Sequence, residues 1–180
     1  MLNIFDTMYN QKYIGENKMS FKGNRIIISM IVGAVMFAAY LIYAFSSNAP
    51  AQDDLSGWAK LIITFLVIAV VVMVAAEVVC HVIFGIMTGV KNHGKGDREI
   101  ERIVEMSSKD DEMDWLIGSR SDVVGYSCMS LSFIVILLGI AFFEMSAVLA
   151  LNVVFAFFAI GSIAEGGLKA YYYERGIRNG

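Results

Sequence analysis

The chain has 180 residues, of which 57% are hydrophobic and 17% charged, and its net charge is −3. Soluble domains carry about 25% charged residues, and nucleic-acid-binding domains are strongly basic, so neither class fits this composition. Cys80 and Cys128 both fall within apolar stretches, and no disulfide framework is expected.

Residues 1–25 are mixed and polar, without the apolar core and cleavage site of a secretory signal. We expect either a cytoplasmic lead-in or a short interfacial helix there. Residues 26–45 then form an apolar run without a charge. A bilayer core of about 30 Å takes about 20 apolar residues at about 1.5 Å each, so this run predicts a first transmembrane helix.

Three further stretches are long enough to cross a membrane. After an outer loop over residues 46–60, residues 61–88 predict the second span. A cytoplasmic connector over 89–122 leads to the third span, 123–143. An outer turn, 144–146, precedes the fourth span, 147–168, and residues 169–180 form a tail. The predicted fold is all-α, an integral membrane four-helix bundle.

Lysine and arginine residues indicate the orientation of the chain. The outer loop contains only Lys60 and the outer turn contains none, whereas all other lysines and arginines lie in residues 1–25, 89–122 and 169–180. Cytoplasmic loops are enriched in these residues. We therefore expect both termini and the connector to be cytoplasmic, in a multi-pass protein of the plasma membrane.

The two halves of the chain look like diverged copies of one helical hairpin. The segment Val74–Glu77 aligns with Ser162–Glu165, and each ends in Ala-Glu near the inner end of a span. Two hairpins that both start inside would be parallel repeats, related by an axis along the membrane normal. Chance similarity of apolar sequence is the alternative.

The connector predicts amphipathic helical structure. Ile100, Ile103 and Val104 have helical spacing with charges between them. A second helix is expected to start after Ser108 with acidic residues and to lie along the inner membrane surface before the chain enters at Val123. A docking surface for a cytoplasmic partner is the alternative, with five candidate residues: Asp111, Glu112, Asp114, Trp115 and Arg120.

This region also resembles a known group of proteins. Asp111–Ile117, followed by Arg120-Ser121-Asp122 and Gly125-Tyr126, is similar to a motif of small prokaryotic four-span membrane proteins of unknown function, as are Glu165 and the stretch Tyr171–Gly176. The resemblance implies a regulatory setting, because such proteins are often encoded beside helix-turn-helix regulators. It implies no catalytic or ligand-binding residues, and the longer outer loop and polar start of this chain depart from the pattern.

Ionisable residues inside the spans are the candidates for chemistry. Glu77 is followed by Cys80 and His81 on the same helical face. Zinc accepts these three ligand types, yet one helix supplies at most three ligands, so we prefer a hydrogen-bonded Glu77–His81 pair and expect no metal or cofactor. Such a pair can also exchange protons. Glu165, the third candidate for a proton or ion path, is predicted to pair with Lys169 at i+4.

These patterns predict a non-enzymatic polytopic membrane protein that senses or scaffolds through its cytoplasmic connector. The alternative is a small oligomeric proton- or cation-linked transporter or channel that uses Glu77 and His81. An enzyme is not expected, since no paired acids, nucleophile–base set or phosphate loop stands in a suitable context. The candidate partners are the lipid bilayer, further copies of this chain and a cytoplasmic regulatory protein; direct nucleic-acid binding is not expected.

Overall fold

The computed structural model describes residues 4–91 and 112–175, and most of these residues are helical. Helix α1 spans Ile4–Ala44, α2 spans Leu55–Lys91, α4 spans Glu112–Phe143 and α5 spans Ala147–Arg175. The predicted all-α class is confirmed. The amphipathic helix expected around Ile100 and Val104, and the docking candidate Asp111, lie outside the described residues.

All four helices are long and apolar enough to cross a membrane, as predicted. The most apolar part of each has a mean hydropathy between 2.2 and 2.9, yet only 6–17% of that part is buried within the protein. Large apolar side chains therefore cover the outside of the helices, as Ile42 and Phe143 do with exposures of 75% and 80%. Such a surface is unfavourable in water and is satisfied by lipid tails.

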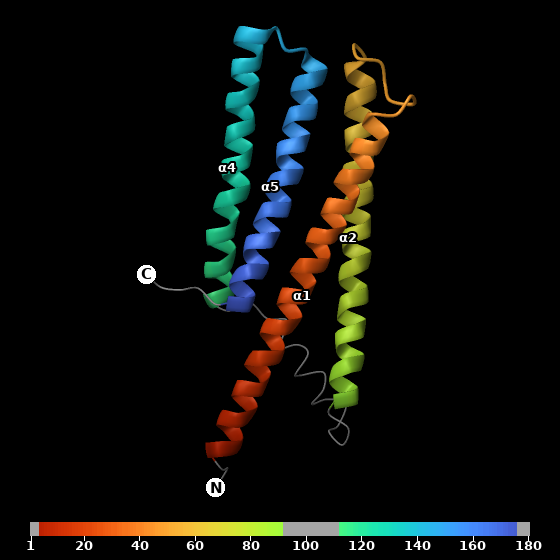
Figure 1. Ribbon diagram of the computed structural model, residues 1–180. Helices are drawn as coiled ribbons and strands as arrows, with labels where there is room; N and C mark the ends of the chain where they lie inside the picture. Colours follow the sequence, from red (N-terminus) through yellow and green to blue (C-terminus); the bar gives the residue numbers. More distant parts are fainter. Residues whose placement is uncertain (1–3, 92–111, 176–180) are drawn as a thin grey trace.

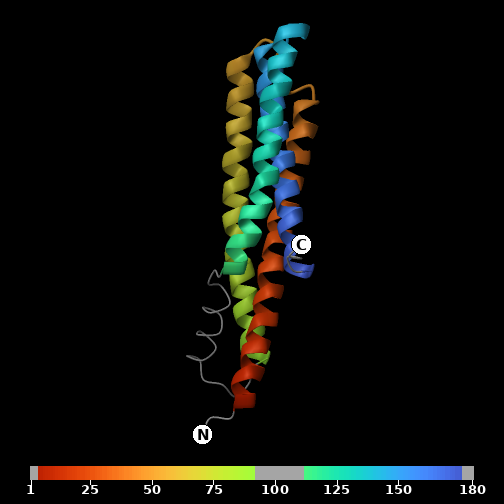
Figure 2. The same cartoon turned by 90° about the vertical axis from the view of Figure 1, so that its left-hand side faces the viewer.

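Figure 1 shows the helices side by side in the order α4, α5, α1, α2, with both short connections at the same end of the molecule, which we call the hairpin end. Turned by 90°, the molecule is elongated along the helix axes (Figure 2). Helix α5 packs against α4 and α1, and α2 packs mainly against α1. Within the described residues no contact joins α4 to α2, so the four helices form an open arrangement rather than a closed ring.

The contacts between the hairpins do not display the predicted parallel repeat. In such a repeat the contact of α1 with α5 would be matched by one of α4 with α2, which is not found between the described parts of these helices. In Figure 1, α1 and α2 also diverge away from the hairpin end, whereas α4 and α5 stay together. The repeat stays a prediction from sequence.

Several helix boundaries differ from those predicted, and α5 extends to Arg175 instead of residue 168. Helix α1 already begins at Ile4, so most of the polar lead-in continues into the first span, and α2 begins at Leu55 instead of residue 61. Helix α4 begins at Glu112 and runs without a break through the third span, so residues 112–122 form no separate surface helix. A continuous helix keeps the backbone hydrogen-bonded as it enters the membrane, which a sharp turn at Val123 would not.

Side-chain caps fix two of the helix starts. The backbone N–H of Gly57 donates to Asp54 Oδ1 over 2.8 Å at the start of α2, and that of Leu149 donates to Ser146 Oγ over 3.2 Å at the start of α5. Each cap satisfies a backbone donor that has no partner within its own helix. Between α4 and α5, Glu144 takes a left-handed conformation with φ of 53°, which reverses the chain within three residues.

An aromatic core closes the hairpin end between α1, α2 and α5. Its buried members are Tyr40, Trp58, Ile62, Val148 and Phe155. The Tyr40 ring packs edge-on against the ring of Phe155, with 4.5 Å between centroids, and its hydroxyl donates to Asn152 Oδ1. The partner is needed because an unbonded tyrosine hydroxyl is costly in an apolar setting.

Helices α4 and α5 approach closely where small residues face each other. A Cβ atom built on Gly161 would lie 2.9 Å from Cys128 Cβ and 3.4 Å from the carbonyl oxygen of Gly125. Only glycine fits at this distance, which is the usual role of small residues between membrane helices. Further from the hairpin end, the same helix interface brings polar residues of α4 and α5 together.

Candidate functional site

Ionisable side chains from all four helices gather at the end opposite the hairpin end, which we call the charged end. Arg25 lies 19 residues from the last residue of α1, Glu77 lies 22 from the first residue of α2, Asp122 lies 21 from the last of α4 and Glu165 lies 18 from the first of α5. At about 1.5 Å per residue these separations are about 27–33 Å, close to the thickness of a bilayer core. The four charges thus mark one level across the molecule.

The first ion pair of this layer joins α1 to α2. Arg25 Nη2 lies 2.7 Å from Glu77 Oε1, and both side chains are about half-buried, with exposures of 38% and 44%. The carboxylate of Glu77 is therefore bound by another helix, in a contact that the expected Glu77–His81 pair did not include. His81 Nδ1 donates to the backbone carbonyl oxygen of Glu77 over 3.0 Å.

The second cluster joins α4 to α5 around Lys169. Its Nζ lies 2.6 Å from Glu165 Oε1 and 2.9 Å from Asp122 Oδ1. The predicted i, i+4 pair of Glu165 and Lys169 is confirmed. The sequence interpretation missed Asp122, because its distance from Lys169 along the chain hides their closeness across the helix interface.

The third cluster is buried and joins α1, α4 and α5. Lys22 Nζ lies 2.6 Å from Asp114 Oδ2, and the Tyr173 hydroxyl donates to Asp114 Oδ1 over 2.6 Å. The side chains of Lys22 and Asp114 are only 7% and 9% exposed. Charges that are removed from solvent to this degree need such partners, and together they fix the first turns of α4 against the other helices.

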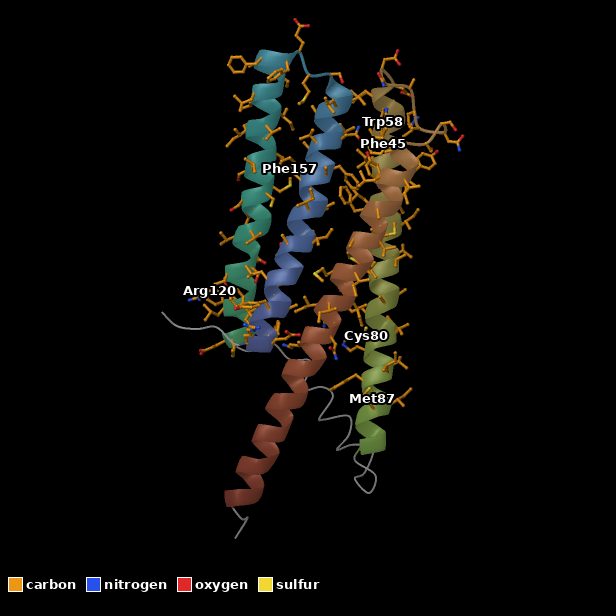
Figure 3. All side chains as sticks on the ribbon, in the orientation of Figure 1. Phe45, Trp58, Cys80, Met87, Arg120 and Phe157 are labelled. Carbon is orange, nitrogen blue, oxygen red and sulfur yellow. The ribbon has the colours of Figure 1, made fainter. Side chains whose placement is uncertain are left out.

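The docking candidates on α4 divide into buried and exposed residues. Asp114 belongs to the buried cluster and is not available to a partner. Glu112 and Arg120 are exposed, and Trp115 is 73% exposed. Figure 3 shows Arg120 pointing away from α5. The exposed candidates therefore stand on a part of α4 that the buried cluster holds in place.

Three pockets lie beside α5 at the charged end. The α4–α5 groove, of about 310 Å³, is lined by Asp122, Gly125, Tyr126, Met129, Phe158, Ser162 and Glu165. A second pocket, of about 270 Å³, is lined by Ile26, Asp114, Trp115, Ile117, Gly118, Lys169 and Tyr173. The third, of about 240 Å³ between α1, α2 and α5, includes Arg25, Ser29, Glu77, Ser162, Glu165 and Lys169.

The helix face with Glu77, Cys80 and His81 does not assemble a metal centre. Across residues 4–91 and 112–175, no three His, Cys, Asp or Glu side chains come together in a way that could hold a metal ion. Cys80 is a free thiol on α2 (Figure 3), and the Glu77 carboxylate is engaged by Arg25. What this end of the molecule can do is bind charged or polar groups in pockets that mix carboxylates with ammonium and guanidinium groups.

No family model, curated protein or solved structure matches this chain. The resemblance of residues 111–176 to small four-span membrane proteins therefore stays a prediction from sequence.

Proposed function

We propose that this chain is a non-enzymatic polytopic membrane protein that senses or scaffolds on the cytoplasmic side through its charged end. The lysines and arginines of the sequence support a cytoplasmic location for that end. Lys22, Arg25 and Lys169 all lie there, whereas the loops between the helices at the hairpin end, 45–54 and 144–146, contain none.

The observation that carries the proposal is the combination of a rigid base with an exposed aromatic side chain. Lys22, Asp114 and Tyr173 hold the start of α4 in place, while Trp115 projects from the same turn with 73% of its surface exposed. Tryptophan and arginine are among the residues that contribute most to protein–protein binding energy, and Arg120 is exposed five residues further along the helix. A surface held on a rigid helix also loses little entropy on binding.

The test is crosslinking in cells from a photoreactive amino acid at position 115, with position 142 at the hairpin end as the matched control. Phe142 is 74% exposed, so accessibility does not distinguish the two positions. We expect a cytoplasmic polypeptide to be crosslinked from 115 and not from 142. The purified partner should then bind Trp115→Ala at least about tenfold more weakly than the unaltered chain. Adducts with lipid alone at position 115 would contradict the proposal.

A second candidate function, proton- or cation-linked transport, is supported by the pocket between α1, α2 and α5. Two carboxylates, Glu77 and Glu165, line it together with Arg25 and Lys169. The aromatic core closes the hairpin half, so a path through the protein would need that core to open. Ion flux into proteoliposomes that falls in Glu77→Gln and His81→Ala would support transport, and flux that both variants leave unchanged would exclude it.

A further inference from the structure

The α4–α5 groove has a charged end and an apolar end. From α4 it is lined by Asp122, Tyr126 and Met129, and from α5 by Phe158, Ser162 and Glu165. Each set has i, i+4, i+7 spacing and so forms one stripe along its helix. Because the helices are antiparallel, the two carboxylates face each other at one end of the groove, and Met129 and Phe158 lie at the other.

The charged end of the groove carries excess negative charge. Lys169 is the cation that binds both carboxylates, so Asp122, Glu165 and Lys169 together have a net charge of −1. Lys169 Nζ lies closest to Oδ1 of Asp122 and Oε1 of Glu165, and Lys169 is not part of the groove lining. Glu165 Oε2 lies against α4 at Gly125, 2.5 Å from the position that an added Cβ would take. The groove therefore presents two carboxylates and a net negative charge to a positively charged group, while Lys169 lies outside its lining.

The walls of the groove are aromatic and apolar. Tyr126 is 72% exposed and Phe158 is 47% exposed, so the groove opens sideways, toward the lipid in a membrane. A cation over the face of an aromatic ring is attracted by the ring's negative charge density, and Met129 offers a polarisable apolar contact. An anion would be repelled by the carboxylates. A strongly hydrated metal ion would lack sufficient oxygen ligands in the groove, and the apolar part would not replace its hydration shell.

We propose that the α4–α5 groove binds a lipophilic organic cation, an ammonium or other onium group on an apolar body. The cationic group lies against Asp122 and Glu165, and the apolar body lies along Tyr126, Met129 and Phe158. This inference does not depend on a cytoplasmic partner and goes beyond the proposed sensing or scaffolding role.

The test uses two probes of the same shape and opposite charge, tetraphenylphosphonium and tetraphenylborate. Binding of each to the full chain is measured in dodecyl maltoside micelles, with empty micelles subtracted. We expect saturable binding of tetraphenylphosphonium and at least tenfold weaker binding of tetraphenylborate. Equal binding of the two probes, or no saturable binding of the cation, would overturn the proposal.

Variants then locate the site. Asp122→Asn should weaken tetraphenylphosphonium binding at least fivefold, and Tyr126→Leu about threefold, because removing a cation–π contact at an exposed ring costs a small factor. Asp53→Asn, the same change in the hairpin-end loop, should bind as the unaltered chain does. Tyr126→Leu leaves all three charges in place, so it tests the groove even if Asp122→Asn loosens the fold. Unchanged affinity in both groove variants would place the cation elsewhere and overturn the assignment.

The cationic group can belong to a free compound or to a lipid headgroup. Micelles supplemented with phosphatidylethanolamine or with phosphatidylglycerol distinguish the two sources. Competition by phosphatidylethanolamine alone would assign the groove to an amine headgroup, and binding that neither lipid reduces would assign it to a free organic cation. Equal competition by both lipids would show that the groove does not select positive charge, against the proposal.

Discussion

Two ion pairs of this protein have nearly the same length and very different surroundings. The Lys22–Asp114 pair, at 2.6 Å, is almost fully buried, whereas the Arg25–Glu77 pair, at 2.7 Å, is about half-exposed. Removing one partner of a buried pair leaves a desolvated charge, which is costly. An exposed pair is screened by solvent and contributes little. Burial, rather than distance, therefore decides what each pair contributes to stability.

Asp114→Asn should lower the free energy of unfolding by about 2–3 kcal/mol, because Lys22 loses the carboxylate that neutralises it in a buried setting. Denaturant titration of the protein in dodecyl maltoside measures this change. Asp53→Asn removes the same charge at an exposed position and should change the free energy by less than about 0.5 kcal/mol. Equal losses in the two variants would show that the Asp114 contacts contribute nothing specific.

Glu77→Gln should cost less than about 1 kcal/mol in the same titration, since the Arg25–Glu77 pair is open to solvent and screening. Added salt should reduce even this difference, because exposed charges are screened within about 10 Å at 0.1 M salt. A loss as large as that of Asp114→Asn would mean that lipid or a second protein chain shields the pair.

At the scale of whole helices, α5 organises the molecule. It contacts α4, α1 and α2, and two of the three ion clusters include one of its residues, Lys169 or Tyr173. Its glycine at the crossing with α4 sets the distance between these helices, and that distance decides whether Lys169 reaches Asp122. Close packing at Gly161 and ion pairing nearer the charged end are thus coupled along one interface.

Gly161→Val should lower the free energy of unfolding by about 1–3 kcal/mol, because the added methyl groups overlap Cys128 and push α4 away. The matched change is Gly118→Ala on α4, where nothing lies within 4 Å of the added Cβ. That variant should keep or gain stability, by up to about 1 kcal/mol, through higher helix propensity. The prediction is contradicted if Gly161→Val unfolds at the same denaturant concentration as the unaltered chain.

For the whole molecule, the two ends differ in chemistry. The hairpin end has an aromatic core and loops without lysine or arginine, while the charged end collects ion pairs from all four helices. This division suits a membrane, because lipid tails satisfy the apolar surface between the two ends and the charges lie about one bilayer thickness from the loops.

Reporter fusions test the orientation that this division implies. Alkaline phosphatase inserted after residue 52 should be active, since the loop is expected outside, and a fluorescent protein fused after residue 180 should fold in the cytoplasm. Both reporters should give the opposite result if the charged end faces outward. Activity of phosphatase at both positions would contradict the three membrane crossings expected between them.

Several features of the charged end could be predicted from the sequence, and others could not. The Glu165–Lys169 pair follows from i, i+4 spacing on one helix. The partners of Glu77 and Asp114 do not follow from such spacing, because Arg25 and Lys22 lie on another helix. Lys22 and Arg25 are three residues apart at the start of the first apolar run, which indicates a shared face but not which helices that face meets.

The sequence by itself predicted a membrane as the medium, and it determined the helical class and the division of the chain into apolar and charged segments. Hydropathy and helical spacing are local properties that add along about 20 residues. Only the tertiary structure decided that α5 and α1 lie in the centre, that Glu77 meets Arg25 and that Asp122 shares Lys169 with Glu165. Those contacts depend on the rotation and register of one helix against another, which close approaches such as Gly161 on Cys128 set and which no single segment encodes.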